Sequence, residues 1–226
     1  MLKEWFRNPE YLWVFDYDLT MYGRDEAYVL HSMDIYISEF VQKELKIDFS
    51  EANCLRKQYW QKYGTTLAGL RKQCNIDPQD YFDFIHSGPC IQIPRYNPNL
   101  QKFLKMLPNQ PWIFTNGRKD WTQMGLANMG VDFDNEKIID IEALQWDGKP
   151  SQAAYDIAAD RLNWPADKIV FLEDKIENLV TAKNNNWNTI LFDPKTPKRH
   201  PSAQFHFNHI QELIHEVVCE LWRIFG

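Results

Sequence analysis

The sequence is poor in cysteine, and its cysteines are not spaced for a shared task. Among 226 residues there are four, Cys54, Cys74, Cys90 and Cys219, and no two of them form a C-x-x-C pair. The histidines do not complete a zinc site either, so neither structural zinc nor a disulfide framework is indicated. We therefore expect reduced thiols in a cytoplasmic protein.

Long apolar runs are missing as well. No segment approaches the roughly 18 uninterrupted apolar residues of a membrane span. The first residues, "MLKEWFRNPEYLWVFDYD", contain neither the apolar stretch nor the small-residue cleavage site of a secretory signal. These two absences predict a soluble protein with no membrane partner.

Positive charge is in the minority. The chain has 25 lysines and arginines against 31 acids, which gives a net charge of -6. This balance disfavours a nucleic-acid binder that works through a broad basic face. A small phosphorylated substrate remains possible because a few local cations are enough to bind it. The composition leaves the oligomeric state open.

Strand and helix signals alternate over the second half of the chain. The segment "WIF" at 112–114 is the first of these strands, and helical spacing follows at 119–130. Such alternation predicts an α/β fold, a Rossmann-like parallel sheet with helices on both faces. The further expected elements are a strand-like stretch at 137–144, a helix at 150–163, a strand at 168–174, a helix at 176–187, a last strand at 188–192 and an amphipathic helix at 209–226.

The first half of the chain has a different pattern. An apolar strand ends at Phe15, and residues 24–87 have helical spacing with no strand signal. One helix there is expected to have Ser50 as its N-cap and to stop at Gly64. We interpret this stretch as an inserted all-helical cap because it lies between the first strand and the rest. The predicted division is a core of residues 1–23 and 95–226 and a cap of residues 24–94.

Polar residues gather where three apolar strands end. The strands run into "FDYDLT", "FTNG" and "FLEDK", and a lysine in "WDGKPS" precedes a helix. Ligands of open parallel sheets bind at the carboxyl ends of the strands, so neighbouring strands would bring these residues together. The residues expected to meet there are Asp16, Asp18, Thr115, Asn116, Lys149, Glu173 and Asp174.

Four carboxylates beside one lysine would raise one another's pKa values, and a divalent cation would relieve the repulsion. Oxygen ligands suit Mg²⁺ better than zinc. Donors from Thr115, Asn116 and Lys149, together with Mg²⁺, describe a site for a phosphoryl group. A carboxylate can attack phosphorus, and a second acid can shuttle the proton. Asp16 and Asp18 supply this division of labour.

Each signal also has an ordinary structural interpretation. Two acids after a strand can simply mark its exit into water, and a "TNG" after a strand is often a turn. Glu173 and Asp174 can favour the dipole at a helix start, and Lys149 can be a solvated loop residue. The order of the four segments along the chain favours the functional interpretation.

These segments resemble a known family. "DYDLT", "FTNG", the isolated lysine and "LEDKIEN" look like the four motifs of the haloacid dehalogenase superfamily of phosphatases, in order, and the first matches D-x-D-x-T in full. The helical insert resembles the superfamily's cap. "YWQKYGTTLAGL" at 59–70, "DLTMYG" and "TNGRKDW" are similar to the pyrimidine 5′-nucleotidase group.

The resemblance implies roles for the acidic residues. Asp16 would be the nucleophile and a metal ligand, and Asp18 the general acid/base, with its backbone carbonyl on the metal. Asp174 would be the direct metal ligand of the fourth motif. Glu173, where Asp or Gly is commoner, and Asn178 would lie outside the first ligand shell.

The resemblance also implies how the substrate is held. Thr115 and Asn116 would bind the transferring phosphoryl group, and Lys149 would stabilise the nucleophile and the phosphoryl charge. Tyr63 and Gly64 are candidate substrate contacts from the cap. The cofactor would be Mg²⁺ and the partner a small phosphorylated substrate. Leu19 stands where the nucleotidase group often has Asn, with little expected consequence.

Some cap and loop residues have two open interpretations. The aromatic residues Tyr59, Trp60 and Tyr63 either stack on a base or fill the cap's core. Arg118 either contacts phosphate or lies on the surface, where Lys119 is expected. The basic stretch "KTPKRH" at 195–200 is expected to be a solvated loop.

Three functions follow as hypotheses. The first is a Mg²⁺-dependent phosphomonoester hydrolase for a nucleoside 5′-monophosphate, a pyrimidine one, acting through an aspartyl phosphate on Asp16. The second is a phosphatase or phosphomutase for another small phosphate, such as a sugar phosphate or phosphoglycolate. The third, disfavoured because no motif residue is missing, is a catalytically silent relative that binds a nucleotide or a protein. A dehalogenase is also disfavoured because its chemistry needs no second acid.

Overall fold

The sheet is parallel throughout and has six strands. The computed structural model describes residues 1–196 and 200–225, with side chains up to Val217. The strand order is β3-β2-β1-β4-β5-β6, and every neighbouring pair is parallel. This confirms the expected α/β fold. The strands are β1 (Leu12–Phe15), β2 (Trp112–Phe114), β3 (Ile138–Ile139), β4 (Ile169–Glu173), β5 (Asn188–Phe192) and β6 (Phe205–Phe207).

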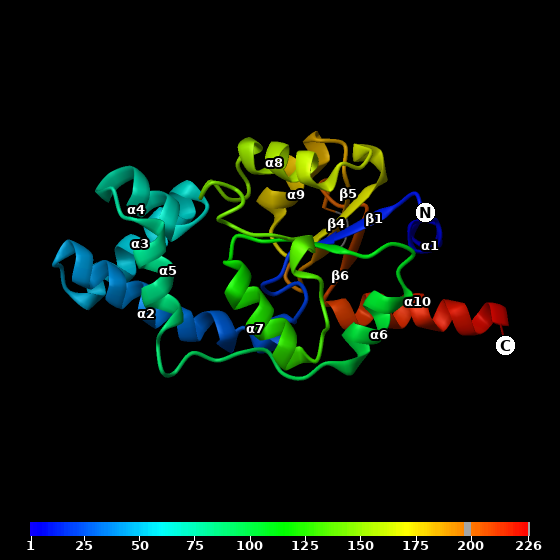
Figure 1. Cartoon of the computed structure of the whole chain (residues 1–226), viewed down its shortest axis with the longest axis horizontal. Coiled ribbons are helices and arrows are strands. Elements are labelled where there is room, and N and C mark those ends of the chain that lie inside the picture. The colour runs from blue at the N-terminus through cyan, green and yellow to red at the C-terminus, as the bar shows by residue number, and fades with distance from the viewer. Residues whose placement is uncertain (197–199, 226) are drawn as a thin grey trace.

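Helices cover both faces of this sheet (Figure 1). Alternate residues of β1 belong to two separate apolar clusters. Trp13 and Phe15 lie in the first cluster, and Leu12 and Val14 lie in the second. A central parallel strand is buried on both sides, which explains why its sequence is an uninterrupted apolar run. The first cluster includes residues of α1 (Leu2–Arg7), α6 (Pro98–Met106), α7 (Lys119–Met129) and α10 (Ile210–Phe225), and the second those of α8 (Gln152–Leu162) and α9 (Ile176–Asn184).

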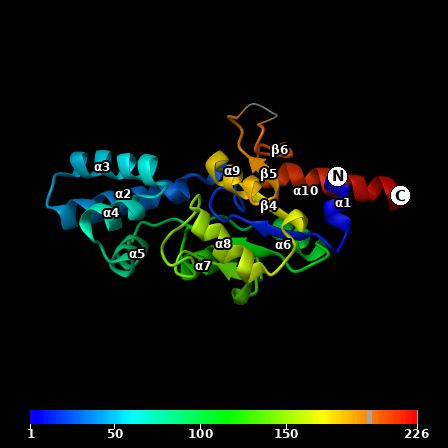
Figure 2. The same cartoon turned by 90° about the horizontal axis from the view of Figure 1, so that it is seen from above.

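A group of helices between β1 and β2 stands to one side of the sheet in both views (Figures 1 and 2). We call them the cap helices, and no strand interrupts them in this fully described stretch. The division of the chain at residues 24 and 94 remains a prediction. The cap helices are α2 (Tyr28–Leu45), α3 (Phe49–Tyr63), α4 (Thr66–Cys74) and α5 (Pro78–His86), preceded by the 3-10 turn η1 (Arg24–Glu26).

The start of α3 differs from the expectation. Ser50 is not the N-cap; Asp48 is, because its carboxylate accepts a hydrogen bond from the Glu51 N–H at 2.9 Å. The Asp48 N–H in turn donates to the Glu51 carboxylate at 3.4 Å, which completes a capping box. The end of the helix is as expected, since Gly64 closes it with a φ of 83°.

Two strands also differ from the expectation. The stretch at 137–144 pairs only at Ile138–Ile139, because the Asp140 carboxylate then accepts the N–H groups of Lys119 and Ala143 and turns the chain. The strand at 188–192 is not the last, since β6 pairs with it at the sheet edge. Short 3-10 turns, η2 (Asn135–Lys137) and η3 (Ala166–Lys168), lead into β3 and β4.

Two further expectations from the sequence concern the basic stretch at 195–200 and the absence of a membrane span. Residues 197–199 of the basic stretch at 195–200 lie outside the described residues. Within the described chain, no helix has both the length and the apolar character needed to cross a membrane.

Candidate active site

The predicted convergence at the carboxyl edge of the sheet is present. Strands β2, β1 and β4 are neighbours, and Phe15 lies in register with both Ile113 and Leu172. Asp16 follows β1 directly, and its N–H donates to the Leu172 carbonyl at 2.8 Å. Thr115 follows β2, and Glu173 is the last residue of β4. The backbone ladder therefore fixes all three at one edge.

Lys149 is the centre of the site. Its Nζ donates to Asp16 Oδ1 at 2.7 Å, to Glu173 Oε2 at 2.8 Å and to the Phe114 carbonyl at 2.7 Å. The side chain is only 1% exposed, so the interpretation as a solvated loop residue is wrong. Burial lowers the pKa of Lys149, but the two carboxylates outweigh it and the net pKa is raised.

Asn116 holds the backbone of Lys149. Its Nδ2 donates to the Lys149 carbonyl at 2.9 Å, and the Lys149 N–H donates to its Oδ1 at 2.8 Å. These two bonds occupy the amide oxygen and one of the two N–H donors of the side chain, and the predicted contact of Asn116 with a phosphoryl group remains a prediction. Gly148 permits this approach, because a Cβ there would lie 2.4 Å from Asn116 Oδ1. Thr115, fully buried, accepts the Gly117 N–H on its hydroxyl at 3.0 Å.

Glu173 has no acceptor capacity to spare. Its Oε1 accepts the backbone N–H groups of Asp174 and Lys175, both at 3.1 Å. Its Oε2 accepts Lys149 Nζ and Asn178 Nδ2, both at 2.8 Å. Four donors fill the lone-pair sites of a carboxylate, which agrees with the expectation that Glu173 lies outside the first ligand shell of a metal. Burial raises its pKa, but Lys149 outweighs burial and the net pKa is lowered.

Asp16 and Asp174 lie in an acidic group whose charge is only partly offset, although Lys149 and Arg24 form ion pairs with them. Ligand oxygens of these two residues and of Glu173 lie within 4.8 Å of one another, and all three residues are buried. Burial and then the Glu173 charge raise the pKa of Asp16 to about 7. The same two causes raise the pKa of Asp174 well above its usual value. A divalent cation would remove this repulsion, so the donor set fits one.

Asp18 lies beside this group with a separate environment. Asp18 Oδ1 accepts a hydrogen bond from the Tyr22 hydroxyl at 2.6 Å, and Asp18 as a whole is only partly buried. Burial raises its pKa, and the Tyr22 bond and nearby lysines partly offset the rise. Asp16 is fixed independently, because Thr20 donates to its Oδ2 at 3.0 Å. The two acids of the first motif therefore have different partners.

Arg24 is a site residue that the sequence reasoning missed. Its Nη2 donates to Asp174 Oδ2 at 3.2 Å. Its Nε forms an ion pair with Asp193 Oδ1 at 3.3 Å, without the alignment of a hydrogen bond. Asp193 follows β5, so Arg24 joins the ends of two strands to the turn that leads into the cap helices. Its only signal in the sequence is its position directly after "DLTMYG".

The two cap residues predicted to contact the substrate, Gly64 and Tyr63, have different neighbours in the structure. Gly64 meets the core, since a Cβ there would lie 3.0 Å from Pro150 Cδ. Tyr63 contacts cap residues: its hydroxyl accepts from Gln73, and Lys62 and Lys72 lie 5.1 and 5.5 Å from its ring. The structure brings Gly64 to the Lys149 loop and records for Tyr63 only contacts within the cap helices. Both roles remain predictions.

The other open alternatives are partly resolved. Tyr59 packs inside the cap, where Gly69 leaves room for its ring, whereas Trp60 is 49% exposed. Arg118 is neither a free phosphate ligand nor a solvated surface residue. Its guanidinium forms ion pairs with Asp83 of α5 at 2.6 Å and with two core acids, Asp120 at 3.0 Å and Glu142 at 3.5 Å. Arg118 thus ties the cap helices to the core.

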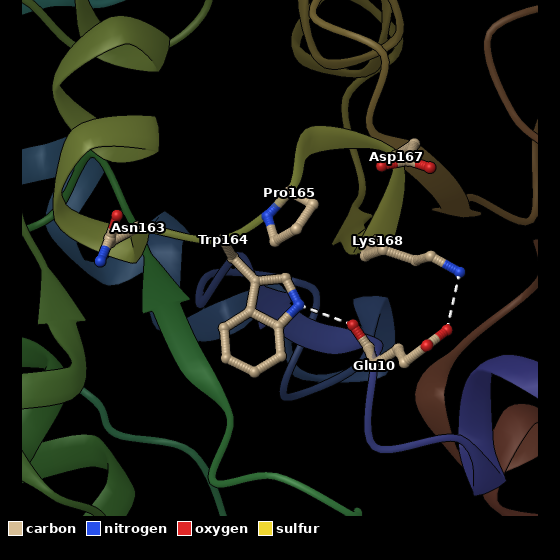
Figure 3. A pocket seen from close by; sticks show the side chains of 6 residues that line it. All are labelled: Glu10, Asn163, Trp164, Pro165, Asp167 and Lys168. Carbon is tan, nitrogen blue, oxygen red and sulfur yellow. Dashed lines mark hydrogen bonds and ion pairs between the residues drawn. The ribbon is translucent and has the colours of Figure 1, made fainter.

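A shallow pocket lies at the opposite edge of the sheet (Figure 3). Its volume is about 450 Å³, and its residues precede β1 and β4 instead of following them. The Lys168 ammonium forms an ion pair with Glu10 there, at 3.0 Å. Neither acid among its lining residues is buried, in contrast to the acids of the carboxyl edge. The lining residues are Glu10, Asn163, Trp164, Pro165, Asp167 and Lys168.

Solved structures share this fold at low sequence identity. The putative HAD-hydrolase YfnB of Bacillus subtilis, bound to magnesium, is 14% identical, with a TM-score of 0.58 and coverage of 92% of this chain and 98% of that chain. A HAD phosphatase from Thermococcus onnurineus is 13% identical, with a TM-score of 0.54 and coverage of 90% and 95%. The L-2-haloacid dehalogenase of Xanthobacter autotrophicus, with chloropropionic acid covalently bound, is 17% identical, with a TM-score of 0.52 and coverage of 91% and 97%.

The sequence itself matches a family pattern over residues 23–186, described as hydrolase, haloacid dehalogenase-like hydrolase. This match begins after the first motif, so the place of Asp16 in the site is known from the structure and not from the match. The matched segment includes the cap helices and strands β2 to β4. The chain belongs to the haloacid dehalogenase-like hydrolase family.

Proposed function

We propose that the protein is a Mg²⁺-dependent phosphomonoester hydrolase that acts through an aspartyl phosphate on Asp16. One observation carries the proposal. The buried carboxylate of Asp16 accepts a hydrogen bond from Lys149, and a second acid with different partners, Asp18, lies two residues further along the chain. Nucleophilic attack and proton transfer need two such groups, and the two acids differ in their partners as the two roles require.

In the proposed reaction, Asp16 attacks the phosphorus atom with a carboxylate oxygen while the bond to the leaving oxygen breaks. Lys149 holds the nucleophile and stabilises the negative charge, and Asp18 gives the leaving oxygen a proton. Asp18 then takes a proton from water, which attacks the acyl phosphate and releases phosphate. Asp16, Asp174 and the Asp18 carbonyl would hold Mg²⁺, which supplies charge neutralisation for the phosphoryl oxygens.

The alternative of dehalogenation is supported by neighbours of the same fold, but it explains fewer residues. Displacement of a halide by a carboxylate requires no proton for the leaving group, so it gives Asp18 no task. It also gives no task to Asp174, which belongs to an acidic group whose repulsion favours a cation. The phosphatase proposal uses all of these residues.

For the substrate, we propose a nucleoside 5′-monophosphate, and a pyrimidine one first. The support is the resemblance of residues 59–70 to the pyrimidine 5′-nucleotidase group and the position of Gly64 at the Lys149 loop. A sugar phosphate, phosphoglycolate or a phosphomutase substrate is the second candidate, because the proposed catalytic residues contact only the phosphoryl group and do not discriminate among phosphomonoesters.

The test is phosphate release from a panel of monophosphates, with Mg²⁺ and with EDTA. The panel holds UMP, CMP, AMP, GMP, ribose 5-phosphate, phosphoglycolate and an aryl phosphate, and chloride release from 2-chloropropionate is measured in parallel. Metal-dependent release that favours UMP and CMP is the expected result. Release from other members alone would keep the chemistry and reject the pyrimidine assignment. Chloride release without phosphate release would reject the chemistry, and no release from any compound would favour a binding role.

A further inference from the structure

Lys175 and Trp60 form a contact between the core and the cap helices that has no part in the catalytic group. Lys175 directly follows Asp174, and Trp60 lies in the last turn of α3. The Lys175 Nζ stands 5.3 Å from the centre of the Trp60 ring. Trp60 is 49% exposed, so the ring retains free surface in spite of this contact.

The position of Lys175 is not explained by the stability of the fold. It is the N-cap residue of α9, where an acceptor side chain is favoured and an ammonium group can only donate. A positive charge at a helix N-terminus also opposes the helix dipole. Within the described part of the chain, its ammonium makes no hydrogen bond or ion pair, and the contact with Trp60 is its only recorded partner.

Lys175 nevertheless lies beside the catalytic acids, because its backbone N–H donates to Glu173 Oε1 at 3.1 Å and Asp174 directly precedes it. Burial raises the pKa of Asp18, and the charge of Lys175 acts against that rise. The same charge acts on Asp174. Lys175 therefore links the acidic group, through its backbone, to an aromatic ring of the cap helices, through its ammonium. In the proposed reaction the leaving oxygen is next to Asp18, so the rest of the leaving group would lie towards this pair.

We propose that Trp60 and Lys175 bind the leaving group, with the indole stacking on a planar ring and the ammonium donating to a carbonyl oxygen on that ring. This inference rests on the proposed function and deepens it. An aromatic face favours flat rings, and a donor-only group favours acceptor oxygens. Uracil and cytosine offer both features, whereas a sugar phosphate offers no ring.

The test compares UMP with ribose 5-phosphate, which has the same sugar and phosphate without the base. Trp60→Ala and Lys175→Met are expected to lower kcat/KM for UMP at least tenfold and fivefold, mainly through KM. Trp60→Ala should leave kcat/KM for ribose 5-phosphate within twofold of the wild type. Lys175→Met, which also removes a charge that acts on Asp18 and Asp174, should lower it clearly less than it lowers kcat/KM for UMP. Trp164→Ala and Lys168→Met, the same residue types at the opposite sheet edge, are the matched controls and should change neither substrate.

Equal losses for both substrates would overturn the inference, because they would indicate that the pair only holds the cap in place. Unchanged values for both would overturn it as well. If the wild type hydrolyses neither compound, the proposed function fails, and the same variants are compared for UMP affinity by calorimetry. Weaker UMP binding in Trp60→Ala and Lys175→Met would then support the pair as a base-binding site, and unchanged affinity would reject it.

Discussion

The two ends of strand β4 carry the same kind of ion pair in opposite surroundings. At the carboxyl end, Lys149 and Glu173 lie 2.8 Å apart, and each side chain is 1% exposed. At the amino end, Lys168 and Glu10 lie 3.0 Å apart, with side chains 28% and 64% exposed (Figure 3). The distances are nearly equal, so distance alone does not distinguish the two pairs.

Burial does distinguish them. Water and salt screen the exposed pair, which makes it a weak contributor to stability. The buried pair is surrounded by further acids whose charges water does not screen, and its lysine is shared with Asp16. Charge at the carboxyl edge therefore raises the pKa values of Asp16 and Asp174 and favours a cation. At the amino edge the two partners stabilise each other's charged forms, so that the pKa of Glu10 is lowered and that of Lys168 is raised. The predictions below change one edge and use the other as its reference.

The largest expected effect is on the proposed nucleophile. Asp16→Asn preserves the volume and a hydrogen-bond acceptor for Lys149, so the protein should remain folded. Phosphate release should fall by about a thousandfold or more, because the attacking carboxylate is gone. Circular dichroism and a steady-state assay measure the two properties. An active, folded Asp16→Asn protein would show that another residue attacks the substrate.

The next effect is on the buried lysine. Lys149→Met removes one partner of a buried network and leaves Asp16 and Glu173 uncompensated. The free energy of unfolding should fall by roughly 3–5 kcal/mol, and activity should be lost. Urea denaturation measures the stability. Equal stabilities for Lys149→Met and the amino-edge variant Lys168→Met would refute the importance of burial.

The contrast also bears on what the sequence alone could predict. The carboxyl edge was predictable because apolar strands that end in acids must converge there once the sheet is parallel. Lys149 was found by its place in the order of segments, and its burial was not visible in "WDGKPS". Strand β6 was missed because "FHF" is short and half-buried, with little strand signal of its own.

Residues that act through distant partners were the ones missed. Arg24 and Asp174 are 150 positions apart, and no local pattern marks such a pair. The clamp of Asn116 on the Lys149 backbone and the saturation of Glu173 by four donors are likewise tertiary geometry. Residue types predicted which groups meet, and only the packed structure assigns each donor to an acceptor.

The third prediction concerns pH in metal-free protein. The raised pKa of Asp16, about 7 against a usual 3.8, means that the folded state holds a proton which the unfolded state has lost. Stability should therefore fall as pH rises from 5 to 7, by about 2 to 3 kcal/mol from this group. The difference between wild type and Asp16→Asn isolates that slope, and Mg²⁺ should abolish it. A difference independent of pH would contradict the shift.

His86 at the cap–core junction should act in the opposite sense. It stacks on Trp121 with ring centres 5.0 Å apart, and burial lowers its pKa from 6.5 to about 4. The folded state disfavours its protonation, so stability from this group is present above pH 6.5 and is lost as pH falls towards 4. The comparison with Asp16→Asn is needed because the two slopes oppose each other over the same range.

A smaller effect is expected from Arg24. Arg24→Gln should weaken Mg²⁺ binding about tenfold, because the residue that orients Asp174 is lost while the proposed ligands themselves remain. Calorimetric titration with Mg²⁺ measures this without any substrate. Unchanged affinity would reduce Arg24 to a structural contact, and tighter binding would show that its charge competes with the cation.

The smallest effect is expected at the amino edge. Lys168→Met, Glu10→Gln and the double variant should each shift Tm by less than about 1 °C, because the side chains are largely solvated and their attraction is screened. The hydrogen bond from the Trp164 indole to the Glu10 carbonyl is a backbone contact and survives both changes. Calorimetry in low and high salt measures the shifts. A loss of several degrees in Lys168→Met that the double variant restores would show that this pair is strongly coupled in spite of its exposure. Burial would then not be what separates the two ends of β4, and the distinction would have to come from the number of acids that surround each lysine.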